Sequence, residues 1–157
     1  MKNAVRCKIR GFTLIELMVT VAVLAVLASL ATPSFRQLLA AQRVRVTGYD
    51  IVSDLVLARS EAIKRGENVT IRPVASDWAL GWTVTVALSN EVLGGQGRVG
   101  NGVKFIVAPT AITFDRNGRT NVSSVIRFGL HDGAINKRCI SLDPSGRPKN
   151  TNSACPP

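Results

Sequence analysis

The chain has 157 residues, which is the size of one domain with at most a short appendage. Hydrophobic residues make up 46% of it, which excludes general disorder. A single histidine, His131, and 5% aromatic residues argue against histidine-based catalysis, a metal site or a base-stacking surface. Twenty Lys and Arg oppose ten Asp and Glu, and the net charge of +10 predicts an anionic partner. We therefore expect a binding or structural protein that is not an enzyme and uses no cofactor or metal.

The first forty residues predict a membrane anchor. Residues 17–35 contain no charged side chain, close to the roughly 20 residues that span a bilayer. The first eleven residues hold no acid and four cations, which places the N-terminus in the cytoplasm and the residues after about 35 outside it. These cations are Lys2, Arg6, Lys8 and Arg10.

Glu16 does not fit an ordinary secretory signal. Such a signal, cleaved near Ala28–Ala31, is the simplest alternative, but the apolar run is long for a signal core. A carboxylate costs roughly 2.5–3.5 kcal/mol at the centre of a bilayer and less near its surface. An acid in this position therefore predicts a partner that neutralises it.

The segment Arg10–Leu17, with the sequence RGFTLIEL, resembles the N-terminal signature of type IV pilins and type II secretion pseudopilins. In that family a prepilin peptidase cuts after the glycine and methylates the new N-terminal phenylalanine. The resemblance implies cleavage between Gly11 and Phe12. It also implies that Glu16 pairs with the amino group of a neighbouring subunit on assembly. A plain membrane anchor remains the alternative.

The resemblance also implies an organisation in three parts. Residues 1–11 are a leader peptide, residues 12–34 a transmembrane and assembly helix, and residues 35–157 a periplasmic domain. The expected location is the inner membrane, with one span and a cytoplasmic N-terminus, and then a pilus or pseudopilus. The expected partners are other pilins or pseudopilins, the prepilin peptidase and the inner membrane.

One long helix is predicted from Phe12 to about Arg65. Pro33 is expected to kink or locally melt it, Gly48 to weaken it and Gly66 to end it. Beyond Pro33, apolar residues recur at spacings of three and four, which predicts a buried stripe. Its members are Val46, Tyr49, Val52, Leu55, Val56, Ala62 and Ile63.

After Gly66 the apolar period changes to two, which predicts strands. Asn117-Gly118 and Asp132-Gly133 are typical of hairpin turns. The fold class is α+β and type IV pilin-like, with a long N-terminal helix whose second half packs on an antiparallel β-sheet. The predicted strands are residues 69–72, 81–88, 104–107, 112–114, 125–128 and 139–142.

The middle of the chain resembles the GspH/FimT branch of the minor pilins. The resemblance lies in residues 57–65 (LARSEAIKR), in Trp78, in Gly81–Val84 and in Ile112–Phe114 before Gly118. Trp78 and Trp82 are expected to be buried against the helix, although ligand stacking is an alternative. Gly95–Gly100 matches a dinucleotide-binding pattern but opens no helix, so residues 94–102 are interpreted as a flexible loop.

The three cysteines are expected on different sides of the membrane. Cys7 lies in the leader, whereas Cys139 and Cys155 lie in the exported part. An oxidising compartment and an even count predict a structural disulfide between them, which would hold an otherwise loose tail, residues 144–157.

Basic residues gather in the last quarter of the chain. Seven cations from Arg116 onward face only Asp132 and Asp143. Gly146-Arg147-Pro148-Lys149 resembles the Gly-Arg-x-Arg element of FimT minor pilins, which bind DNA during natural transformation, although Lys149 replaces the second arginine. Solvated surface charge is the alternative explanation. The candidate DNA-binding residues are Arg147, Lys149, Gly146, Arg138, Lys137, Arg119 and Arg116.

Two functions remain open at this point. A FimT-like minor type IV pilin would bind incoming DNA non-specifically, with DNA as a further partner. A GspH-like minor pseudopilin would instead contact other proteins in a type II secretion system. The basic tail favours the first.

Overall fold

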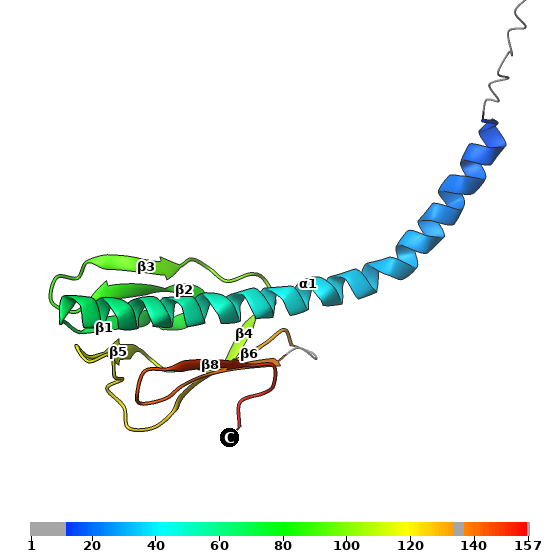
Figure 1. The fold of residues 1–157 in the computed structure, drawn as a ribbon. Helices are drawn as coiled ribbons and strands as arrows, with labels where there is room; N and C mark the ends of the chain where they lie inside the picture. Colours follow the sequence, from blue (N-terminus) through cyan, green and yellow to red (C-terminus); the bar gives the residue numbers. More distant parts are fainter. Residues whose placement is uncertain (1–11, 134–136, 157) are drawn as a thin grey trace, which may run out of the picture. The chain divides into compact units, whose positions relative to one another are not determined.

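The computed structural model describes residues 12–133 and 137–156 (Figure 1). The chain divides into two compact units, residues 1–38 and residues 39–157. The predicted leader, residues 1–11, lies outside the described residues, and so do Cys7 and Gly11.

Helix α1 (Leu14–Arg65) runs from the first unit into the second. Thr13 caps its N-terminus, because its hydroxyl accepts a hydrogen bond from the backbone N–H of Glu16 (3.3 Å). The chain is helical through Pro33, so the predicted local melting does not occur. Gly66 ends the helix as predicted, and its N–H donates to the carbonyl of Ala62 (3.0 Å).

The first half of α1 is apolar and exposed. Its most apolar 18-residue window has a mean hydropathy of 2.5, so α1 is long and apolar enough to cross a membrane. The hydroxyls of Thr20, Ser29 and Thr32 donate to backbone carbonyls of the preceding turn at 2.7–2.8 Å. These bonds satisfy three side-chain hydroxyls within the helix itself, as a membrane-spanning helix would require.

Within the described residues, eight strands follow α1 and form two antiparallel sheets. The first sheet has the order β3-β2-β1-β5, and β1 lies between β2 and β5. Its strands are β1 (Val69–Val74), β2 (Asp77–Val86), β3 (Val92–Gln96) and β5 (Ile112–Phe114).

The second sheet has the order β4-β6-β7-β8, so β6 and β7 are its central strands. Its strands are β4 (Lys104–Val107), β6 (Ile126–His131), β7 (Lys137–Leu142) and β8 (Pro148–Thr151). The prediction of a long helix with antiparallel sheet structure is confirmed, and the antiparallel strands are divided between two sheets.

Two strands were not predicted. Strand β3 takes up the start of the glycine-rich segment, so the interpretation of residues 94–102 as one flexible loop is wrong. Glycine permits this pairing because a side chain at Gly95 would place its Cβ 2.3 Å from the carbonyl oxygen of Trp82. Strand β8 likewise replaces part of the tail expected to be loose.

The core lies between α1 and both sheets, and the buried face of the helix agrees only in part with the predicted one: Leu55 and Ala62 are buried as predicted, and Val52 packs against the core. Tyr49 and Val46 are 50% and 54% exposed, so their expected burial is wrong, as it is for Val56 and Ile63. The observed face includes small residues that a search for large apolar side chains overlooks. Its buried residues are Val44, Thr47, Gly48, Ile51, Leu55, Ala58 and Ala62.

Small side chains on this face let the helix approach the second sheet closely. A Cβ at Gly48 would lie 3.3 Å from the side-chain nitrogen of Asn150 and 3.4 Å from Cδ of Arg138. Gly48 is therefore a packing position and not merely a weak point in the helix.

The two tryptophans are buried, as predicted. Trp82 donates from Nε1 to Oδ2 of Asp54 on α1 (2.7 Å), so its polar atom is satisfied within the core. Trp78 makes an edge-to-face contact with Phe128, with ring centroids 4.8 Å apart, and thereby joins the first sheet to the second.

The predicted disulfide between Cys139 and Cys155 is present, with 4.8 Å between the Cα atoms. It connects β7 with the chain that follows β8. The bridge closes a loop with a sequence separation of 16, which stabilises the fold by roughly 3 kcal/mol in the loop-entropy account.

Candidate nucleic-acid interface

Two turns with the pattern Asp-x-x-Gly-Arg place arginines at the surface. They are Asp115–Arg119 and Asp143–Arg147. In each, the glycine N–H donates to the aspartate carbonyl (2.8 and 2.9 Å), and the arginine N–H donates to the aspartate Oδ1 (2.9 and 3.0 Å). The two turns therefore share one internal hydrogen-bond pattern.

A glycine is required at the fourth position of both turns. Gly118 and Gly146 have φ values of 71° and 79°, in the left-handed region that other residues rarely adopt. They also lack room for a side chain, since a Cβ at Gly146 would lie 2.2 Å from the carbonyl oxygen of Gly118. The predicted hairpin turn at Asn117-Gly118 is thus confirmed, and it packs against the second turn.

The turn pair is tied to the helix. Arg59 of α1 donates from Nε to the carbonyl of Gly118 (3.0 Å), and the N–H of Thr120 donates to the carbonyl of Pro144 (3.2 Å). The side-chain carboxylate of Asp143 accepts from the Ser145 hydroxyl and from the Arg147 N–H, and these bonds lower its pKa. The carboxylate is thus used inside the turn.

The arginines of the turn pair remain available to a ligand. Arg116, Arg119 and Arg147 are exposed, and no carboxylate of residues 12–133 and 137–156 forms an ion pair with them within 4 Å. We call Arg116, Arg119 and Arg147, with their two turns, the turn cluster.

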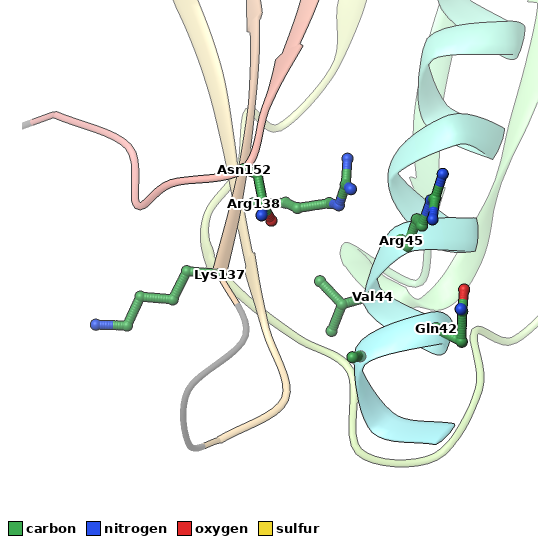
Figure 2. Close-up of a pocket in the computed structure, with 7 residues that line it drawn as sticks. Gln42, Val44, Arg45, Lys137, Arg138 and Asn152 are labelled. Carbon is green, nitrogen blue, oxygen red and sulfur yellow. The ribbon is translucent and has the colours of Figure 1, made fainter. Parts of the chain in front are cut away.

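Lys137 and Arg138, adjacent in sequence, point to opposite sides of β7. Arg138 extends toward α1, and Lys137 extends away from it (Figure 2). Arg138 lies over the Tyr49 ring (5.4 Å to its centroid) and donates to Oδ1 of Asn150 (3.0 Å). The two side chains therefore point in different directions, although both residues line one pocket beside the helix.

Arg138 belongs to a polar pocket of about 200 Å³ beside the helix. Arg45 of α1 also lies near the Tyr49 ring, at 5.7 Å from its centroid. The side-chain nitrogen of Asn150 is buried without a hydrogen-bond partner among the described residues. The pocket is lined by Ala41, Gln42, Val44, Arg45, Lys137, Arg138 and Asn152 (Figure 2).

Lys149 lies on β8 and pairs with Ser141 of β7. The segment Gly146–Lys149 is therefore not a single loop, because its first half ends a turn and its second half begins a strand. Arg147 and Lys149 consequently belong to different local structures, which the sequence alone did not indicate.

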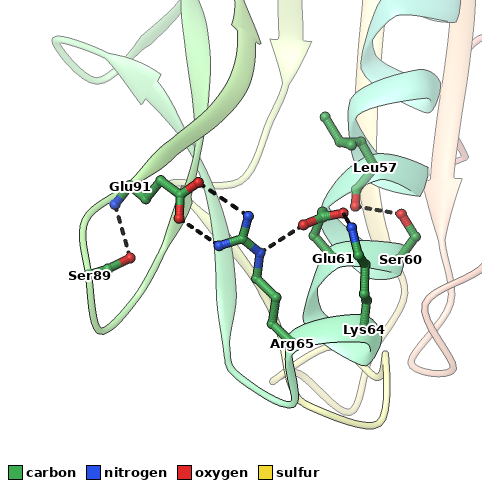
Figure 3. Close-up of polar contacts among 7 residues, drawn as sticks. All are labelled: Leu57, Ser60, Glu61, Lys64, Arg65, Ser89 and Glu91. Carbon is green, nitrogen blue, oxygen red and sulfur yellow. Dashed lines mark hydrogen bonds and ion pairs between the residues drawn. The ribbon is translucent and has the colours of Figure 1, made fainter.

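Two glutamates, Glu61 and Glu91, are bound by Arg65 near the C-terminal end of α1. Arg65 donates to Glu61 (2.8 Å) and to both oxygens of Glu91 (2.6 and 3.2 Å), as Figure 3 shows. These hydrogen bonds lower the pKa of both glutamates and raise that of Arg65. The glutamates thus neutralise a cation of the helix, and the carboxylates of the turn cluster are those of its own Asp115 and Asp143.

Asp50 is an acid of a different kind, on the helix beside Asp54. Burial raises its pKa, and the charge of Asp54 raises it further.

Among the described residues, no group of three or more His, Cys, Asp or Glu side chains could hold a metal ion.

Comparisons with known proteins identify the family. A model of the family described as type II transport protein GspH matches residues 49–146. A model of the prokaryotic N-terminal methylation motif matches residues 6–32. Comparison with curated protein sequences gives no significant match.

Solved structures share the fold. The type IV minor pilin FimU of Pseudomonas aeruginosa superposes with a TM-score of 0.60 at 21% identity, over 70% of this chain and 89% of that one. The minor pseudopilin EpsH from the Type 2 Secretion System of Vibrio cholerae superposes with a TM-score of 0.53 at 12% identity, over 70% of this chain and 97% of that one.

The family model covers more than half of the sequence and reaches from α1 to the second turn of the turn cluster. The chain therefore belongs to the GspH family of pilin-like proteins and carries the N-terminal methylation motif of prokaryotic pilins.

Proposed function

We propose that this member of the GspH family is a FimT-like minor type IV pilin that binds DNA without sequence preference during uptake. The observation that carries the proposal is the turn cluster, which presents arginines without paired acids. Contacts to phosphate alone position a protein on DNA and carry no base information. The proposal assigns the chain no catalytic activity.

The second candidate is a minor pseudopilin of a type II secretion system. The family description, type II transport protein GspH, and the fold shared with EpsH favour it. Such a subunit would bind other pseudopilins and would have no need of DNA. The two candidates share the leader, the helix and the assembly step, so they differ in the ligand of the basic surface.

In both candidates the chain enters a filament through its N-terminus. We propose that the peptidase cuts between Gly11 and Phe12, which places the new amino group two residues before α1 begins. Glu16 lies in the first turn of α1 and is exposed in the single chain, so its carboxylate is available to a neighbouring subunit. Pairing removes the cost of an isolated charge in the membrane.

Processing is tested on protein extracted from membranes. We expect the mature chain to begin at Phe12 with an N-methyl group, as measured by mass spectrometry of the intact protein and of its N-terminal peptide. A mature N-terminus near residue 32, or retention of residues 1–11, would show that the chain is not processed as a pilin.

The role of Glu16 is tested with two substitutions, because Thr13 and Glu16 also have the spacing of a helix capping box. Glu16→Gln keeps the capping capacity and removes the charge, whereas Glu16→Ala removes both. We expect both variants to insert into the membrane and both to be depleted from sheared filaments. Wild-type incorporation of Glu16→Gln would refute the charge pairing and leave only the cap.

DNA binding is tested with a fragment that begins near Phe35. This fragment contains the whole buried core, whose first residue is Val44. We expect weak binding to duplexes of unrelated sequence, with dissociation constants of roughly 10⁻⁴–10⁻⁶ M near physiological salt. Several copies in a filament would raise the apparent affinity.

The variant Arg119→Gln with Arg147→Gln removes two of the three arginine side chains of the turn cluster and leaves its backbone bonds in place. We expect it to weaken binding to all sequences equally and to reduce the slope of log K against log salt by up to about 1.8, from about 0.9 per phosphate contact. Arg72→Gln with Arg98→Gln, two exposed arginines on or near the first sheet, is the control of equal charge. Absence of wild-type binding at low salt would favour the secretion pseudopilin.

A further inference from the structure

The two sheets differ sharply in charge. The four strands of the second sheet contain five cations and no acid, whereas those of the first contain one arginine and one aspartate. The five cations are Lys104, Arg127, Lys137, Arg138 and Lys149. The segment that follows β8, residues 152–157, also contains no charged side chain. Positive charge therefore concentrates on one sheet of the domain.

The register of the strands sorts these cations by face. Phe128 of β6 pairs with Ile140 of β7, and Leu130 of β6 pairs with Arg138, the strand residue that extends toward α1. Phe128, Ile140 and Leu130 are buried in the core, so this face is the inner one. Because successive side chains of a strand alternate between faces, the residues between them point outward.

Four of the five cations lie on the outward face, in two rows across the strands. Arg127 pairs with Ser141, which pairs with Lys149, and this gives one row. Lys104 pairs with His131, which pairs with Lys137, and this gives the other. The side chains of Lys104, Lys137 and Lys149 are exposed, and that of Arg127 is half-buried. The ring of His131, which lies between Lys104 and Lys137 in this row, accepts a hydrogen bond at Nδ1 from the N–H of Gly133 (3.0 Å).

A neutral strip separates the two rows. It consists of Gly129, Cys139 and Thr151, which pair across β6, β7 and β8. The disulfide joins Cys155 to Cys139 of this strip, and a Cβ added at Gly129 would be in ordinary van der Waals contact with Sγ of Cys155, at 3.8 Å. The bridge thus anchors a segment without charged side chains beside the strip.

We propose that this outward face of the second sheet is a phosphate-binding surface that extends the DNA site beyond the turn cluster. The inference rests on the proposed function and names a second, separate set of residues for it. We call Lys104, Lys137, Arg127 and Lys149 the sheet rows.

The dimensions of the sheet rows suit a duplex backbone. Along the strands, the two rows are four residues apart, which corresponds to about 13 Å. Across the strands, the two cations of each row are separated by two strand spacings, which corresponds to about 10 Å. A duplex carries one phosphate charge per about 1.7 Å of its axis, so roughly eight phosphates lie along 13 Å. Each cation can meet a phosphate in many registers, which accounts for binding without sequence preference.

The test compares three double variants of the fragment that begins near Phe35. Lys104→Gln with Lys137→Gln removes one of the two rows, whereas Arg119→Gln with Arg147→Gln, the turn-cluster variant, leaves both rows intact. Arg72→Gln with Arg98→Gln removes the same charge on or near the other sheet and serves as the control. Fluorescence anisotropy of two labelled duplexes of unrelated sequence, titrated at several NaCl concentrations, gives the affinity and the salt slope of each protein.

We expect Lys104→Gln with Lys137→Gln to reduce the salt slope by up to about 1.8 and to weaken both duplexes by the same factor. The control should keep the wild-type slope. If the salt slope of Lys104→Gln with Lys137→Gln equals that of the control, the sheet rows do not bind phosphate. The proposed function would still stand in that case, provided that the turn-cluster variant loses affinity. Absence of wild-type binding, or binding to vesicles of anionic lipid but not to duplexes, would overturn both.

Discussion

The close contact between the second half of α1 and both sheets is the constraint on which the rest of the domain depends. On the side of the second sheet, Gly48 lets the helix approach Ile140 and Asn150. On the side of the first sheet, Asp54 accepts the Trp82 N–H inside the core, and Arg59 holds the turn at Gly118. The helix thus fixes the strands and the turns in one arrangement. A fully buried Ile51 or Leu55 stabilises this packing by roughly 1.5–3 kcal/mol each.

The same packing separates the charges of the domain. Glu61 and Glu91 form ion pairs with Arg65 near the end of the helix. The carboxylate of Asp143 accepts hydrogen bonds from Ser145 and Arg147 within its own turn. The cations of the second sheet point away from the helix except for Arg138, whose guanidinium lies over Tyr49. What remains for a ligand is a surface with positive charge and little competing acid. Such a surface acts through long-range attraction, which salt screens.

The sequence predicted the features that depend on local patterns. The leader charges, the apolar run, Gly66 and the alternating strands are each visible within a few residues, and the fold class followed from them. The disulfide was predictable because only two cysteines follow the apolar run. The resemblance of RGFTLIEL to pilin signatures agrees with the match to the N-terminal methylation motif.

The failures share a physical cause, which is that they concern contacts between distant segments. The buried face of α1 was predicted only in part because Gly48, Ala58 and Thr47 carry no strong apolar signal, yet they permit the closest approach. Strand β8 was missed because Pro148 begins it and polar residues fill it, so only pairing with β7 defines it. The repeated Asp-x-x-Gly-Arg pattern is visible in the sequence, but its packing at Gly118 and Gly146 is not.

The most direct test of this account is the stability of Gly48→Leu, with Ser53→Leu as the control on the exposed side of the same helix. Leucine forms helix better than glycine by roughly 0.8 kcal/mol, so propensity alone would stabilise the first variant. We predict instead that Gly48→Leu lowers the free energy of unfolding of the fragment by about 1–3 kcal/mol, because its side chain forces the helix away from β7 and β8. Ser53→Leu should change this free energy by less than about 0.5 kcal/mol. Equal or greater stability of Gly48→Leu in urea-induced unfolding would contradict the close packing of α1 on the second sheet.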